Sequence, residues 1–464
     1  MKAFLGPALA IQCATAAAAP NFVFILCDNL GNGDVACFHP QTKHRTPHLD
    51  RMAAEGRRFT SFYAASGVCT PSRAALMTGC YAQRIGLHAG GTSLVLRPVD
   101  AKGLHPGEET IAEVLKKAGY ATAIVGKWHL GDQPEFLPTR QGFDSFFGIP
   151  YSDDMVKEKF PETWPELPLM RDERVVEAPA DRATLTQRYT EEAIRFLEAN
   201  RERPFFLYLA HAMPGSTTDP FASARFEGRS ANGHYGDSVE EIDWSTGEIL
   251  AALARLRLDE KTLVVWTADN GAVRRDPPQG SNAPYQGYMN GIAEGGMRVP
   301  CLARWPGKIP AGTVSDELCT MMDVLPTFAK LAGAPLPARK IDGRDMSGLL
   351  LGEPGAASSY DETGFFYYHL DQLQAVRAGE WKLYLPLEKR LGPARKNVVG
   401  KTELFDVRHD FAEARELSAE HPDVVRRMKA MAEAAREEIG DFGKPGHGQR
   451  PAGMVENPRP QLLR

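Results

Sequence analysis

Four short apolar runs, each followed by polar residues, constrain the fold of this chain more than any other feature of its sequence. Continuous apolar runs of this length are typical of strands buried on both faces of a parallel sheet. Helical patterns lie between them, so strand and helix alternate from about residue 21 to residue 340. The alternation predicts an α/β fold with a large mixed, mainly parallel sheet sandwiched by helices. The four runs are residues 22–26, 121–125, 205–210 and 263–268.

Local signals mark where two of the helices begin. Thr46 is followed by Pro47, a residue favoured at the first helical position, and Gly56 closes the apolar pattern. Thr110 and Glu113 have the spacing of a capping box, in which each side chain binds the backbone amide of the other residue. We therefore expect helices to begin after Thr46 and after Thr110.

The C-terminal part has a different pattern. Short strand-like segments with turns between them cover residues 365–368, 374–377 and 381–386, and a charged helix is expected over 422–439. This pattern predicts a small antiparallel sheet with one helix. We expect a catalytic domain over residues 21–350 and an α+β subdomain with a surface tail over 351–464.

The first twenty residues resemble an export signal. Lys2 gives a positive start, residues 3–10 are apolar, and residues 14–19 are small. The alternative is an ordinary buried N-terminal segment. We favour a signal peptide over residues 1–20 and a periplasmic or secreted protein. No later stretch approaches the roughly 20 apolar residues of a transmembrane helix, so none is expected.

Charge and cysteine usage exclude two classes of function. The net charge is −5 with no long basic run, so nucleic-acid binding has no electrostatic support. The seven cysteines are scattered without a CxxC pair, which argues against a zinc site and specifies no disulfide.

Polar residues follow each of the four apolar runs. Parallel α/β sheets bind ligands beyond the carboxyl ends of their strands, so these side chains are expected to share one cleft. Their amide and carboxylate oxygens suit calcium or magnesium better than zinc. The alternative is that each Asp or Asn only caps the loop that follows it. The residues are Asp28, Asn29, Lys127, His129, His211, Asp269 and Asn270.

Cys69 opens a segment that ends with Arg73. Pro71 and Ser72 indicate a helix start, and the free amides at a helix N-terminus favour an anion. Cys69 is then either a thiol of low pKa or a small buried residue. The residue types alone leave both alternatives open.

Several motifs resemble those of the type I sulfatases of the alkaline-phosphatase superfamily. The most specific is C-x-P-S-R followed by A-A-L-M-T-G, which starts at Cys69. Others are G-K-W-H-L-G at residues 126–131, T-A-D-N-G at 267–271 and E-G-G-M-R-V-P at 294–300. They occur in the family's order over residues 21–340. The chain looks closest to enzymes resembling arylsulfatase A and N-acetylgalactosamine-6-sulfatase.

The resemblance implies a function and a modified residue. A separate maturating enzyme would oxidise Cys69 to formylglycine, whose hydrate attacks the sulfur of a sulfated carbohydrate or aryl ester. Asp28, Asn29, Asp269 and Asn270, with residue 69, would hold one calcium ion, with magnesium as the alternative. Arg73 and Lys127 would stabilise the diol and the sulfate, and His129 would transfer a proton nearby.

Three positions depart from the family pattern. Asn29 stands where many members have a second aspartate, which removes one negative charge from the metal site. Gly215 replaces the histidine expected to protonate the leaving group. His211 lies nearby in another register, as a catalytic candidate or as a structural histidine. Met289 replaces a lysine that binds sulfate.

These departures leave two other functions open. One is a catalytically impaired protein that binds sulfated glycans, and the other is a phosphate or phosphonate ester hydrolase of the same superfamily. Loops 85–105, 150–185 and 273–292 are expected to line the substrate pocket. Within them, Arg97 and His105 are either sulfate-binding or ordinary solvated residues.

Overall fold

The structure is a computed structural model that describes residues 19–91, 93–389, 391–392 and 400–463. The signal peptide expected over residues 1–20 lies almost entirely outside the described residues, so that assignment stays a prediction. None of the described helices is long and apolar enough to cross a membrane. All six cysteines in the described ranges have free thiols.

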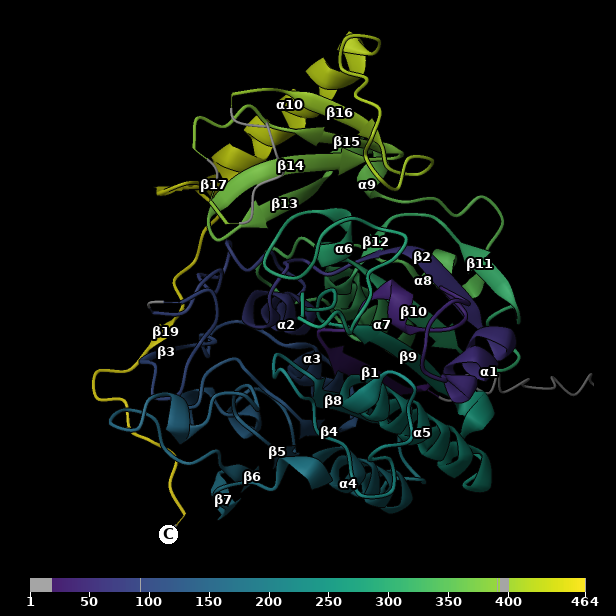
Figure 1. Cartoon of the computed structure of the whole chain (residues 1–464), viewed down its shortest axis with the longest axis vertical. Coiled ribbons are helices and arrows are strands. Elements are labelled where there is room, and N and C mark those ends of the chain that lie inside the picture. Colours follow the sequence, from purple (N-terminus) through teal and green to yellow (C-terminus); the bar gives the residue numbers. More distant parts are fainter. Residues whose placement is uncertain (1–18, 92, 390, 393–399, 464) are drawn as a thin grey trace, which may run out of the picture.

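One large mixed sheet forms the centre of the molecule (Figure 1). Its strands are β1 (Asn21–Asp28), β2 (Arg57–Tyr63), β4 (Ala121–Gly126), β5 (Ser145–Gly148), β6 (Leu169–Arg171), β7 (Arg174–Glu177), β8 (Phe205–Pro214), β9 (Thr262–Ala268), β10 (Arg298–Arg304), β11 (Thr313–Ser315) and β12 (Cys319–Thr320). Within the described ranges the order is β11-β2-β10-β9-β1-β8-β4-β5-β6-β7, with β12 beside β2.

The four strands expected from the sequence are neighbours at the centre of this sheet. β9, β1, β8 and β4 run parallel, and Leu26 is in register with both Ala210 and Thr267. Their carboxyl ends therefore meet at one edge. β10 is antiparallel to β9 and β2, and β6 is antiparallel to β5 and β7. The predicted fold class is confirmed.

Helices cover both faces of the sheet. Successive side chains of a strand point to opposite faces. Phe205 of β8 contacts the ring of Phe196 in α4, whereas Phe22 of β1 stacks on Phe328 in α7 at 4.2 Å. One layer contains α1 (Pro47–Glu55), α4 (Leu185–Ala199) and α5 (Gly233–Arg255). The other contains α2 (Cys69–Thr78), α3 (Ile111–Lys117) and α7 (Val324–Ala332).

The predicted capping box is present at the start of α3. The Thr110 hydroxyl accepts from the Glu113 amide at 3.2 Å, and the Glu113 carboxylate accepts from the Thr110 amide at 2.7 Å. The helix expected after Thr46 also begins where predicted, with Pro47 as its first residue. Three further helices are short: α6 (Glu294–Met297), α8 (Ser347–Leu351) and α9 (Tyr360–Thr363).

A second, antiparallel sheet lies at one end of the molecule (Figure 1). It consists of β13 (Phe365–His369), β14 (Gln372–Ala378), β15 (Trp381–Tyr384) and β16 (Glu403–Asp406), and α10 (Pro422–Glu438) packs against it. This matches the small sheet and helix expected from the sequence. The domain boundary proposed at residue 350 stays a prediction, and it falls within α8.

The C-terminal tail returns to the main domain. After the short pair β17 (Gly440–Asp441) and β18 (Lys444–Pro445), β19 (Gly453–Met454) pairs with β3 (Lys102–Gly103). Arg450 forms an ion pair with Glu108 at 2.7 Å. The tail therefore lies along the surface of the main domain, as expected from the sequence.

A buried charge cluster joins the two sheets. Glu294, at the start of α6, accepts from Lys382 of β15 at 2.8 Å and from the Tyr367 hydroxyl of β13 at 2.9 Å. Its other oxygen accepts from Tyr63 of β2. Burial alone would raise the pKa of Glu294, but Lys382, Arg377 and Arg298 outweigh it and lower the pKa to about 2.

Candidate active site

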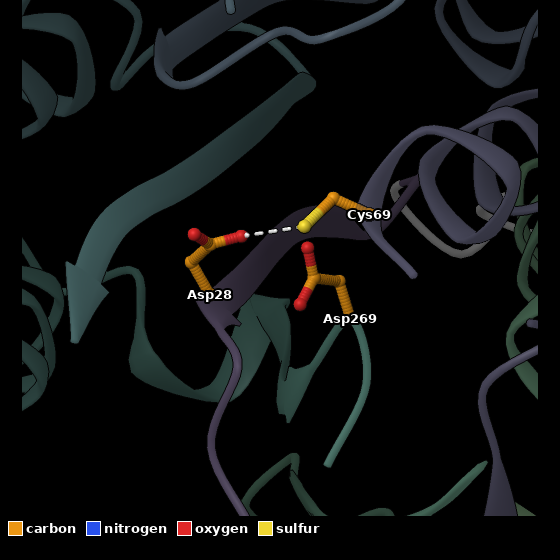
Figure 2. A group of neighbouring side chains, drawn as sticks. All are labelled: Asp28, Cys69 and Asp269. Atoms are coloured by element: carbon orange, nitrogen blue, oxygen red, sulfur yellow. Dashed lines mark hydrogen bonds between the residues drawn. The ribbon is translucent and has the colours of Figure 1, made fainter. Parts of the chain in front are cut away.

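The parallel strands bring the predicted site residues together. Asp28 ends β1, Asp269 follows β9, and Cys69 begins α2. Figure 2 shows the three side chains converging, and their ligand atoms all lie within 4.8 Å of one another. All three are buried. The cleft expected at the carboxyl ends of the strands therefore contains both the cysteine and the acidic residues.

Cys69 is held against the end of β1. Its Sγ atom lies 3.3 Å from Asp28 Oδ1 and 3.6 Å from Asn29 Oδ1. Burial, Asp269 and Asp28 raise the pKa of the thiol well above its ordinary value. This direction favours the second alternative, a buried cysteine, over a thiol of low pKa, because desolvation and two carboxylates outweigh Lys127 and Arg73.

Arg73 lies one turn into α2 and is completely buried. Its guanidinium donates to Asp269 Oδ2 and Asp28 Oδ1, each at 3.0 Å, and to the Lys127 carbonyl at 2.9 Å. Although burial disfavours a charge, Asp269 raises the pKa of Arg73, which stays cationic. Arg73 thus fixes the relative positions of three strand ends.

Lys127 supplies the second buried cation. Its ammonium donates to Asp28 Oδ1 at 2.8 Å and to Ser152 Oγ at 3.1 Å. Burial opposes its charge, but Asp28 raises the pKa of Lys127 above its ordinary value. Burial likewise opposes ionisation of Asp28, yet Lys127 and Arg73 lower the pKa of that carboxyl, so it is ionised at neutral pH.

Two asparagines complete the oxygen-rich side of the site. Asn29 has a φ of 60°, its amide N–H donates to Asp269 Oδ1 at 3.0 Å, and its Nδ2 donates to Ser216 at 2.9 Å. Asn270 Nδ2 donates to Asn29 Oδ1 at 2.6 Å. Non-glycine residues rarely adopt positive φ, and such strain concentrates at functional sites.

The side-chain oxygens at this edge of the sheet are suitable ligands for a calcium ion. Asp28 Oδ2 and Asn270 Oδ1 are buried and have no hydrogen-bond partner. Buried oxygens without partners are rare in folded proteins, so they indicate a missing ligand. Carboxylate and amide oxygens are the ligands that calcium prefers. Asp28, Asn29, Asp269 and Asn270 therefore form a chemically suitable set.

His129 faces the same cluster with a neutral ring. Burial, Lys127 and Arg73 lower its pKa well below the ordinary value. Its Nε2 lies 2.9 Å from the Leu96 carbonyl. A carbonyl only accepts, so Nε2 carries the proton and Nδ1 is the accepting nitrogen. Nδ1 is buried and has no partner, and the φ of 64° again indicates local strain.

His211 is not part of this cluster. It lies on the face of β8 that packs against α4 and α5, because odd-numbered residues of this strand point there. Its Nε2 is 3.3 Å from the Ser245 hydroxyl of α5, and burial lowers its pKa to about 3. This placement favours the alternative interpretation of His211 as a structural histidine.

A pocket of about 180 Å³ opens over Cys69. All three loops that the sequence singled out contribute to it. Arg97 and His105 are not among its described lining residues: Arg97 lies over the Phe160 ring, and His105 accepts from the Gly107 amide. The lining residues are Val68, Cys69, Ser93, Leu94, Val95, His129, Ser152, Asp154, Met155, Ser216, Met289 and Asn290.

Sequence reasoning missed two residues of the site. Ser152 binds Lys127, and its neighbour Asp153 is completely buried with no hydrogen-bond partner for either carboxylate oxygen. Both lie in a loop after β5, where no apolar periodicity marks their position. The only available signal was their place in the predicted pocket loop 150–185.

This fold and site are those of an enzyme that hydrolyses sulfate esters. The sulfatase family model matches residues 20–334, and a model described as N-sulphoglucosamine sulphohydrolase, C-terminal, matches residues 290–438. The chain therefore belongs to the sulfatase family.

Individual relatives agree with this assignment. Arylsulfatase A of Homo sapiens is 42% identical over 79% of this chain and 74% of its own length. Steryl-sulfatase of Mus musculus is 36% identical over 90% and 82%. N-acetylgalactosamine-6-sulfatase of Canis lupus familiaris is 40% identical over 79% and 71%.

A solved structure is similar throughout. The crystal structure of Ps i-CgsB in complex with k-i-k-neocarrahexaose superposes with a TM-score of 0.73 at 26% identity, covering 90% of this chain and 92% of that one.

Proposed function

We propose that this sulfatase uses a formylglycine derived from Cys69 and one bound calcium ion to hydrolyse sulfated carbohydrates, with aryl sulfates as a second substrate class. The observation that carries the proposal is the convergence of Cys69, Asp28, Arg73 and Lys127 in one buried cluster. In the modified enzyme, a hydroxyl of the hydrated aldehyde would take the place of the Cys69 Sγ atom.

The residues of the site would have two roles, metal binding and neutralisation of the reacting anion. Asp28, Asn29, Asp269 and Asn270 would hold the metal, which when bound neutralises the sulfate and acidifies the attacking hydroxyl. The remaining groups orient and neutralise the reacting anion, which is the main demand in transfer of a tetrahedral oxyanion.

Three residues would act next to residue 69. Lys127 places a fixed positive charge beside Asp28, where it can meet a sulfate oxygen. Arg73 keeps Asp28 and Asp269 apart at a set distance. His129 presents an unprotonated Nδ1, which suits acceptance of a proton from a hydroxyl on residue 69.

Two relatives support the proposed substrate class. N-acetylgalactosamine-6-sulfatase is named for a sulfated sugar, and the Ps i-CgsB crystal contains an oligosaccharide. We extend this class to the present chain. We also propose export to the periplasm or secretion, and maturation by a separate formylglycine-generating enzyme, since Cys69 must be oxidised by another protein.

The test combines mass spectrometry with turnover. The peptide containing residue 69 should show the mass of formylglycine, and the matured protein should release sulfate from 4-nitrophenyl sulfate. Cys69→Ala should abolish turnover, whereas Cys301→Ala, a buried control in β10, should not. Unmodified Cys69 together with absent turnover would contradict the proposal.

The same assay distinguishes the sulfatase from a catalytically impaired protein that only binds sulfated glycans. Met289 and Gly215 stand where the family pattern expects a lysine and a histidine, which favours an impaired protein that binds sulfated glycans. Formylglycine with sulfate release contradicts that candidate. Retained glycan binding without release, measured by calorimetry with a sulfated oligosaccharide, would establish it.

A further inference from the structure

Another pocket, of about 510 Å³, lies in the loop between β9 and α6, and we call it the Arg275 pocket. Two of its lining residues, Arg274 and Arg275, are cations, and one, Asp276, is an anion. The lining therefore has a net positive charge, which favours an anionic ligand. The lining residues are Arg274, Arg275, Asp276, Pro278, Gln279, Gly280 and Tyr288.

Arg275 is a buried cation that keeps an unused donor group. The residue is only 9% exposed. Its Nη2 donates to the Gly215 carbonyl at 2.6 Å and its Nε to the Thr217 carbonyl at 3.2 Å, whereas Nη1 has no hydrogen-bond partner among the described residues. The guanidinium also lies over the Tyr235 ring, 4.8 Å from its centroid. The side chain is therefore fixed, and its Nη1 donors remain for a ligand.

None of the described carboxylates is bonded to this guanidinium. Both of its hydrogen bonds go to main-chain carbonyls, and Asp34, Asp28 and Asp153 act on it only from a greater distance. Burial lowers the pKa of Arg275 despite these carboxylates, but an arginine stays protonated in a protein. A buried cation without a bonded counter-ion is costly, so an anion bound beside it would stabilise it.

Two further polar atoms around the pocket lack partners. Gln279 has a buried Oε1 without a hydrogen bond, and the Thr217 hydroxyl is likewise unpartnered. An amide oxygen accepts and a hydroxyl donates or accepts, so both atoms suit the hydroxyls of a sugar. Tyr288, which is 40% exposed, adds an aromatic ring with a polar tip. The lining therefore fits an anionic sugar better than a simple inorganic anion.

The Arg275 pocket borders the pocket over Cys69 through two segments of the chain. Arg275 binds the carbonyls on either side of Ser216, and Ser216 lines the pocket over Cys69. Tyr288 lines the Arg275 pocket, and the next residue, Met289, lines the pocket over Cys69. A ligand that spans both pockets would therefore place one group near residue 69 and another near Arg275.

We propose that the Arg275 pocket binds a second anionic group, a sulfate or a carboxylate, on the sugar next to the one whose sulfate ester is cleaved. This assignment rests on the proposed hydrolysis of sulfated carbohydrates. Arg275 binds the anion through Nη1, and Arg274 adds a second positive charge. Binding energy from such a remote group can position the reacting ester, which offsets the lysine that Met289 replaces.

Three disaccharides test the assignment. Each contains N-acetylgalactosamine 6-sulfate, and the neighbouring sugar is neutral, sulfated or a uronic acid. Calorimetry on the Cys69→Ala protein measures binding without turnover. An anionic neighbour should tighten binding about tenfold over the neutral one, the order expected of one charge-assisted hydrogen bond. Preference for the sulfated disaccharide, the uronic acid or both identifies the second anion, and the preference should shrink as salt is added.

Substitutions in the same Cys69→Ala background locate the preference. Arg275→Gln should abolish it, Arg275→Lys should keep part of it because the charge remains, and the exposed Arg274→Gln should reduce it. Arg427→Gln, at an exposed position on α10, is the charge-matched control and should keep it in full.

Three results would overturn the assignment. The first is a protein that binds the three disaccharides equally or binds none of them. The second is a preference that survives both glutamine substitutions. The third is equal weakening of all three disaccharides by both of those variants, which indicates a purely structural effect.

Turnover of 4-nitrophenyl sulfate by the unsubstituted protein reports on the proposed function separately. Sulfate release without the anion preference contradicts the Arg275 pocket assignment alone. The anion preference without sulfate release contradicts the proposed hydrolysis alone.

Discussion

At the scale of single residues, Arg73 has the most demanding position in the molecule. It is buried, it contacts two carboxylates, and it donates to the carbonyl of a third strand end. Breaking a buried ion pair by removing one partner is costly, because the other charge is left without compensation. Arg73 is therefore needed for stability as well as for the proposed chemistry.

Arg73→Met should lower the free energy of unfolding by about 3–5 kcal/mol, since Asp269 would lose its buried ion-pair partner and Asp28 would keep only Lys127. Urea unfolding followed by circular dichroism measures the change. The matched control is Arg51→Met, because Arg51 forms an exposed ion pair with Glu55 on α1. That control should change stability by no more than about 0.5 kcal/mol.

Calcium should stabilise the folded protein by binding to Asp28, Asn29, Asp269 and Asn270. At about 100 times its dissociation constant, a ligand that binds only the native state adds about 2.7 kcal/mol. Thermal unfolding with calcium and with a chelator should therefore differ by several degrees. Asn270→Ala, which removes the unpartnered Asn270 oxygen, should reduce that difference. A calcium-independent melting temperature in wild-type protein would contradict the metal assignment.

At the scale of helices and strands, a short sequence motif predicts an element correctly where the interactions that form the element join residues close in the sequence. The capping box at the start of α3 joins Thr110 and Glu113, which are three residues apart, and both of its hydrogen bonds form. The Thr110 hydroxyl also donates to the Gln141 carbonyl at 2.8 Å. One side chain therefore secures the helix start and a neighbouring turn.

Thr110→Ala should cost about 1 kcal/mol of stability through loss of the cap. Activity per folded molecule should stay the same, because α3 does not line the pocket. Denaturant unfolding and an activity assay at one temperature measure the two effects. Thr139→Ala, at an exposed hydroxyl bound to Glu173, serves as the control. Equal stability of both variants would show that the cap contributes nothing.

The difference between local and long-range interactions explains which parts of the fold and site could be predicted from the sequence. The four central strands were predicted because strands buried on both faces are continuously apolar. The antiparallel strands β2 and β10 were missed, since arginines and Pro300 interrupt their apolar residues. His211 was misplaced because the face of a residue depends on strand register. Asp153 was missed because its burial arises from the packing of distant loops.

At the scale of the whole molecule, the charge cluster around Glu294 joins the two sheets. Glu294 comes from the main domain, whereas Lys382 and Tyr367 come from the C-terminal sheet. Each partner is buried, so none is screened by solvent. Docking of the second sheet therefore depends on an ionised carboxylate at this position.

This dependence predicts how stability varies with pH. The folded pKa of Glu294 is about 2, below its ordinary value of 4.5, so the stabilisation is present above pH 4.5 and is lost as the pH falls towards 2. Glu294→Gln should remove on the order of 3 kcal/mol of that pH-dependent stability. The measurement is the urea midpoint at pH 7 and pH 3.

The expected result is a smaller acid-induced loss in Glu294→Gln than in wild-type protein. Glu433→Gln, an exposed position on α10 that pairs with Arg436, should retain the full loss. An identical pH response in all three proteins would show that this cluster does not link proton binding to docking of the second sheet.

The pairing of β19 with β3 also has a consequence for the order of events during synthesis. The tail contacts residues made much earlier, since Arg450 and its partner Glu108 are 342 residues apart. On a ribosome these contacts form only once the tail has emerged, long after the segment around β3 was made. Until then the segment around β3, which follows the pocket loop containing Leu96, lacks its outer cover. Under the proposed maturation, an enzyme that oxidises Cys69, only 4% exposed in the finished fold, would reach it more easily before the tail has docked.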